Sequence, residues 1–145
     1  MKGKEKYKDL EINGSWYRVE KFDAKTGSYV VYKLLAQVLP ILPMLTKEVD
    51  ADAFRNQLPS VLTKLSREEF DELQTACLKV CSRLEGNSKL PMPIVTDDGR
   101  MAIEELNDDT VTIMLLTVQA IAFNVTSFFD ENTLKGFLSL TNTKG

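Results

Sequence analysis

The sequence predicts an α+β fold, mainly α, in which an N-terminal β-hairpin is followed by four to six helices packed around a central apolar helix. Three observations predict this class. An Asn-Gly pair separates two short strand-like runs, apolar residues recur with helical spacing from Tyr29 onward, and no charged residue occurs from Thr110 to Phe129. With 145 residues, of which 43% are apolar, we expect one domain over residues 10–140, between a flexible basic N-terminus (1–9) and a flexible C-terminus (141–145).

The first element is the hairpin, predicted over Leu10–Phe22. Asn13-Gly14 is the favoured dipeptide for a two-residue hairpin turn, and the residues around it suit strands. Four apolar residues are expected to share one face of the hairpin: Leu10, Ile12, Tyr17 and Val19. Thr26-Gly27-Ser28 then supplies a turn and a helix N-cap.

Helices are predicted for most of the remaining chain. The first covers Tyr29–Leu45 and breaks near Leu39, because Pro40 and Pro43 follow. The next three are expected over Ala51–Leu65, over Phe70–Leu84 behind a Ser66–Glu69 capping box, and after an Asp108-Asp109 cap. Between the last two, Asp97-Asp98-Gly99 favours a turn over a metal site, because no further oxygen ligands surround it.

The composition and motifs argue against catalysis and against a disulfide, a metal site or a cofactor. The chain has no histidine, and its two cysteines, Cys77 and Cys81, lie four residues apart in the predicted helix. That spacing lacks the geometry of a normal disulfide, so we expect buried, reduced thiols without a metal. No catalytic constellation or phosphate loop is present in the sequence, so we expect no enzyme and no cofactor.

Charge is unevenly distributed in a chain of net charge −3. Residues 1–33 hold eight basic and five acidic residues, and the rest of the chain is acidic. The lysine-rich start has no arginine and precedes no recognition motif, which argues against nucleic acid as a partner. A charged start without an apolar segment also indicates a reducing, cytoplasmic setting.

The stretch from Thr110 to Phe129 is too apolar for an ordinary surface helix. It contains seven polar residues and is flanked by acidic residues at both ends, which argues against a membrane span. A helix that is apolar nearly all round must be buried, by the other helices of the domain, by a second copy or by an apolar partner. The sequence leaves these alternatives open.

Two segments resemble tail assembly chaperones of long-tailed, siphovirus-like bacteriophages. One is the hairpin sequence from Ser15 to Ala24, with Lys25-Thr26-Gly27 leading into the apolar run Leu34–Pro40. The other is Ala122–Phe129, which is similar to an N-x-x-x-F-F pattern near the C-terminus of several such proteins. The resemblance implies a small, non-catalytic protein of the host bacterial cytoplasm that associates with the long tape-measure protein during tail assembly and in some cases with itself.

We therefore expect binding of apolar helical segments of a tape-measure-like protein. The residues expected to contact this partner belong to two charge-free elements, Leu34–Leu45 and Ile113–Phe129. They are Leu35, Leu42, Leu116, Phe123 and Phe128. The alternatives are a structural component of the phage tail or head and, less favoured, a nucleic-acid-binding regulator.

Overall fold

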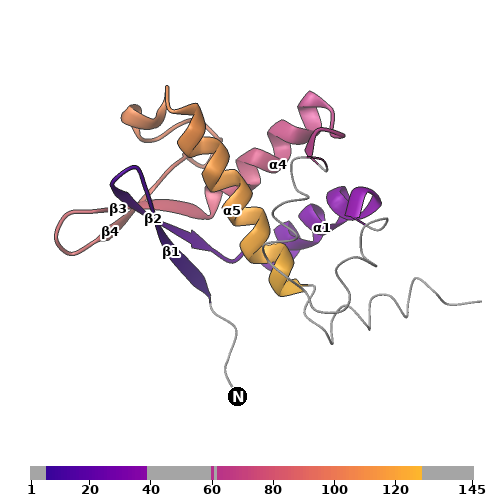
Figure 1. The fold of residues 1–145 in the computed structure, drawn as a ribbon, viewed down its shortest axis with the longest axis horizontal. Coiled ribbons are helices and arrows are strands. Elements are labelled where there is room, and N and C mark those ends of the chain that lie inside the picture. The colour runs from indigo at the N-terminus through magenta and orange to yellow at the C-terminus, as the bar shows by residue number, and fades with distance from the viewer. Residues whose placement is uncertain (1–5, 39–59, 61, 129–145) are drawn as a thin grey trace, which may run out of the picture.

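A computed structural model describes residues 6–38, 60 and 62–128, with the backbone alone for 34–38 and 125–128. Its sheet contains β1 (Tyr7–Ile12), β2 (Ser15–Glu20), β3 (Cys81–Glu85) and β4 (Leu90–Pro93). Its helices are α1 (Ala24–Val38), α4 (Arg67–Lys79), the short 3₁₀ helix η2 (Glu104–Leu106) and α5 (Thr110–Phe128). Figure 1 shows α5 crossing the middle of the molecule, with the sheet on one side and α1 and α4 on the other.

The strands form one antiparallel sheet in the order β1-β2-β3-β4. The N-terminal hairpin is confirmed, with Leu10 opposite Tyr17 and Ile12 opposite Ser15. Asn13 and Gly14 connect the strands with φ of 52° and 86°. Two consecutive positive φ angles define the turn type whose twist matches that of a hairpin, which is why Asn-Gly is favoured there.

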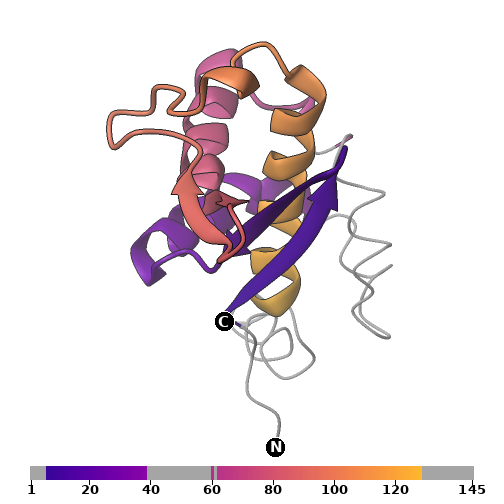
Figure 2. The same ribbon diagram turned by 90° about the vertical axis from the view of Figure 1, so that its left-hand side faces the viewer.

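One face of the sheet contacts the helices. Tyr17, Val19 and Cys81 are buried on this face, and Val19 pairs directly with Cys81 across β2 and β3. Figure 2 looks onto the sheet and shows the three helices behind it. The other face of the sheet carries Trp16 and Arg18, and no helix covers it among the described residues.

α1 begins earlier than predicted, because Asp23 caps it. The Asp23 carboxylate accepts the Thr26 backbone N–H at 3.1 Å and the Thr26 hydroxyl at 2.6 Å. These bonds lower the pKa of Asp23 and incorporate the predicted Thr26-Gly27-Ser28 turn into the helix. The predicted break near Leu39 lies outside the described residues.

α4 begins as predicted and ends sooner. Ser66 Oγ accepts the Glu69 N–H at 3.1 Å, and Glu69 accepts the Ser66 N–H at 2.9 Å, which completes the capping box. The helix stops at Lys79, because the next carbonyl, that of Val80, accepts the Glu20 N–H of β2 at 2.8 Å. The prediction of helix to Leu84 was therefore wrong, and Cys81 starts a strand.

The predicted fold class also needs correction. The described residues contain three α-helices and a four-stranded antiparallel sheet, so four to six helices around a central one is wrong. The missing strands are β3, which was predicted to continue a helix, and β4, for which the sequence predicted no separate strand. The predicted helix over Ala51–Leu65 lies mostly outside the described residues.

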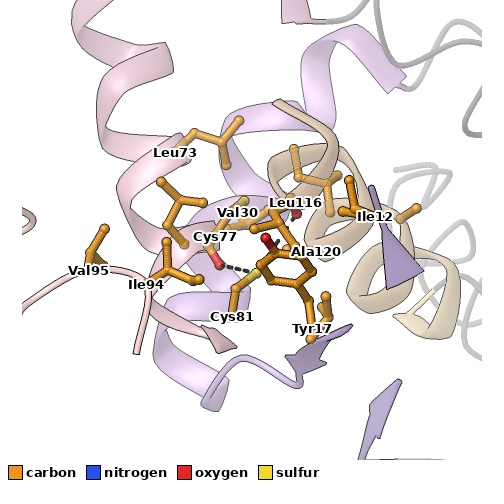
Figure 3. Packing of buried hydrophobic residues seen from close by; sticks show 14 of the residues in the cluster. Ile12, Tyr17, Val30, Leu73, Cys77, Cys81, Ile94, Val95, Leu116 and Ala120 are labelled. Atoms are coloured by element: carbon orange, nitrogen blue, oxygen red, sulfur yellow. Dashed lines mark hydrogen bonds between the residues drawn. The ribbon is translucent and has the colours of Figure 1, made fainter. Parts of the chain in front are cut away.

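The core lies between the sheet and the helices. Figure 3 shows Leu116 and Ala120 of α5 packed beside Tyr17 and Cys81. Cys77 and Cys81 are buried, as predicted, and both are free thiols in the structure. Burial raises the pKa of the Cys77 thiol and raises that of Cys81 to about 12, so neither is a thiolate near neutral pH.

Candidate partner-binding site

The candidate site is the solvent side of α5, and its geometry begins with the helix cap. Asp109 accepts the Thr112 backbone N–H at 3.1 Å and the Thr112 hydroxyl at 2.8 Å. The predicted aspartate cap is therefore present, and it places a carboxylate at the positive end of the helix dipole. This cap fixes where α5 starts.

Polar groups hold the inner side of α5 to its neighbours. Gln74 of α4 donates to Thr117 Oγ1 at 3.2 Å, and the Thr117 hydroxyl donates to the Ile113 carbonyl at 2.8 Å. The Cys81 Sγ lies 3.9 Å from the Leu116 carbonyl oxygen. Because Thr112 and Thr117 bond within or beside their own helix, both can be buried without leaving a polar atom unpaired.

The outer side of α5 carries exposed apolar residues. Val111 is 62% exposed, Leu115 41% and Met114 36%, and Val118 is half-buried. Their spacing of three and four residues places all of them on one side of the helix. We call these four residues the α5 stripe: Val111, Met114, Leu115 and Val118.

No residue of the α5 stripe is charged. A surface helix ordinarily carries charged side chains on its solvent side, whereas none occurs anywhere in α5. Contiguous exposed apolar residues of this kind mark interaction surfaces in soluble proteins. None of the helices in the described part of the chain is long and apolar enough to span a membrane.

The residues predicted from the sequence do not form this stripe. Leu116 has no exposed surface and belongs to the core, while Phe123 is half-buried with the Lys21 ammonium 5.7 Å from its ring centre. The structure gives only the backbone at Leu35 and Phe128, and Leu42 lies outside the described residues. The structure therefore brings none of these five together in a described contact.

The sequence shows Val111, Met114 and Leu115 on a single helical face. The partner contacts in this helix were instead expected at Leu116, Phe123 and Phe128. The positions of Thr112 and Thr117 identify the inner side, but only once their local hydrogen bonds are known.

The outer face of the sheet is a weaker candidate for a partner-binding surface. The outer sheet face carries Trp16, whose ring lies 5.3 Å from the Lys89 ammonium, and Tyr7, whose ring lies 4.0 Å from the Arg18 guanidinium. The Arg18 guanidinium also pairs with Asp9 at 2.8 Å, which lowers the pKa of that carboxyl. These aromatic side chains are therefore partly covered by cations of the same chain.

The segment Asp97-Asp98-Gly99 forms a turn, as the sequence predicts. Asp98 accepts from the Thr96 hydroxyl and pairs with Arg100 at 3.1 Å, and Gly99 has φ of 88°. Among the residues that the structure describes, no group of three or more His, Cys, Asp or Glu side chains could hold a metal ion.

An antiparallel sheet backed by helices, with an uncharged apolar helix side left exposed, is typical of a protein-binding domain. The chain matches the family model described as phage tail assembly chaperone protein (TAC) over residues 13–138. That range covers most of the chain, including β2, α4 and α5, and the protein therefore belongs to this family. The comparison with curated proteins found no match, and neither did the comparison with solved structures.

Proposed function

We propose that this chaperone binds apolar helical segments of a tape-measure-like protein while the phage tail is assembled. Family membership supports a role in tail assembly. The observation that carries the finer proposal is the exposed α5 stripe, which suits apolar helical segments better than charged or nucleic-acid partners. Such segments aggregate in water when they are left uncovered, so a protein that covers them keeps the client soluble.

The proposed contact surface also includes apolar residues outside the α5 stripe. Phe123 and Phe128 continue α5 beyond the stripe, and Leu35 and Leu42 belong to the other charge-free segment. Leu116 supports the stripe from the core. The protein acts in the host cytoplasm and without catalysis, and self-association is one further way of covering the same apolar surface.

Co-expression tests this function. The tape-measure protein of the same phage is produced alone, with the chaperone, or with an unrelated soluble domain of similar size. We expect the client in the soluble fraction only with the chaperone. Equal solubility in all three cultures contradicts the proposal.

The alternative, a structural component of the tail or head, predicts a different outcome. Mass spectrometry of purified phage particles should find no copies of an assembly chaperone. A fixed number of copies per particle favours the structural role instead.

A further inference from the structure

The exposed part of the α5 stripe has a limited length. Val111 and Val118 are separated by two helical turns, which corresponds to about 10 Å along the helix axis. The next residue in the same row, Ala122, is only 3% exposed. Because packed helix axes lie 8–10 Å apart, a patch of about this length is covered by one helix crossing α5, rather than by a long parallel zipper.

The surroundings of the stripe are acidic at one end. Glu104, Glu105, Asp108 and Asp109 precede or begin α5, and no basic residue occurs between residues 104 and 128. Glu105 pairs with the Arg83 guanidinium at 2.7 Å, and Asp109 caps the helix. Glu104 and Asp108 are exposed, and neither makes an ion pair within the described part of the chain.

We propose that the α5 stripe binds a single amphipathic helix of the client whose uncharged apolar seam is flanked by lysine or arginine, with the basic residues next to Glu104 and Asp108. This inference rests on the proposed function and specifies its partner chemistry. The apolar seam supplies the buried area, and the basic flank fixes the orientation of the helix, because it lies beside the acidic end of the stripe.

A second copy of this chain fits the surface less well. The α5 helix of a second copy has no basic residue to place opposite Glu104 and Asp108, and it brings carboxylates of its own. Two stripes packed together would bury apolar area without satisfying the acidic end. Charge complementarity therefore favours a basic-flanked partner helix.

Two labelled synthetic peptides of about 20 residues test this inference. Both share one leucine and alanine seam, and the flanks are lysine in one and glutamate in the other. Fluorescence anisotropy at low salt should show the lysine peptide binding at least tenfold more tightly, with the difference shrinking as salt is raised.

Variants locate the binding to the stripe. Leu115→Gln removes apolar contact area from an exposed position and should weaken binding of the lysine peptide roughly tenfold. The matched control is Tyr32→Gln on α1, where the side chain is 73% exposed, and it should bind as the wild type does. A double variant with Glu104→Lys and Asp108→Lys should prefer the glutamate peptide.

Equal affinity for the two peptides, or unchanged binding by Leu115→Gln, overturns the inference. So does a wild-type dimer that Leu115→Gln converts to a monomer, because the occupant would then be a second copy. The two proposals fail separately. If the Leu115→Gln variant keeps the client as soluble as the wild type does, only the docking surface is contradicted. If the wild-type protein does not keep the client soluble, the proposed function is contradicted.

Discussion

The side-chain oxygen of Asn124 on α5 accepts the backbone N–H of Phe22 at 2.8 Å, across 102 residues of sequence. The amide nitrogen of the same side chain donates to the carbonyl oxygen of Glu20 at 3.2 Å and to that of Ala120 at 3.0 Å. Phe22 and Glu20 lie where the chain leaves β2 for α1. One amide therefore fixes the end of the hairpin against α5, and so orients the stripe relative to the sheet.

Replacing Asn124 with Ala should lower the free energy of unfolding by about 1–3 kcal/mol. The cost arises mainly because the Phe22 N–H loses its partner in a half-buried position, while the exposed Glu20 carbonyl can accept from water instead. Urea denaturation followed by circular dichroism measures the change. Asn107→Ala is the matched control, since Asn107 is exposed and its side chain makes no hydrogen bond within the described residues. A loss no larger than that of the control contradicts this role of Asn124.

The Tyr29 hydroxyl donates to the Glu72 carboxylate at 3.0 Å and links α1 to α4. Burial, and then this hydrogen bond, raise the pKa of Tyr29 from 10.0 to about 12. A folded-state pKa above the unfolded value contributes stability that is fully present below pH 10 and is lost as the pH rises toward 12. We therefore expect the urea midpoint to fall over this range, and to fall less in Tyr29→Phe. Identical pH profiles for the two proteins contradict the linkage.

The two thiols should react slowly in the folded protein. Cys77 and Cys81 are buried, and burial raises the pKa of both, so the reactive thiolate is scarce and inaccessible. Labelling with an aromatic disulfide reagent near pH 8 should be more than about a hundredfold slower than in urea. The exposed-thiol variant Tyr32→Cys is an internal control that should label quickly. Rapid labelling of either native cysteine contradicts the packing around β3.

Local signals explain which elements the sequence predicted correctly. The Asn13-Gly14 turn, the Ser66–Glu69 capping box and the Asp109 cap each depend on residues within a few positions of one another. Such preferences act the same way in any fold. β3 could not be predicted in this way, because Cys81 leaves the helical pattern only when it pairs with Val19 from the other end of the chain.

The side of α5 that faces the core differs more from the sequence prediction than β3 does. Polar residues on an apolar helix ordinarily face solvent, yet Thr112 and Thr117 face the core and the half-buried Asn124 bonds inward to the chain after β2. Asp109 satisfies the Thr112 hydroxyl, and Gln74 and the Ile113 carbonyl satisfy that of Thr117. The exposed apolar stripe is the consequence, because turning the polar residues inward turns Val111 and Leu115 outward.

Two neighbouring leucines test this orientation directly. Leu116 has no exposed surface, whereas Leu115 is 41% exposed. Leu116→Ala should lower the free energy of unfolding by about 2–5 kcal/mol, because it removes buried methyl groups and leaves a cavity among Tyr17, Cys81 and Ala120. Leu115→Ala should change it much less, by about 1 kcal/mol or less, since both residues have similar helix propensities and the Leu115 side chain is partly exposed to water. Thermal and urea denaturation of the two variants measure the difference. Equal losses, or a greater loss for Leu115→Ala, would mean that α5 is rotated and that Leu116, as expected from the sequence, lies on the partner-binding side.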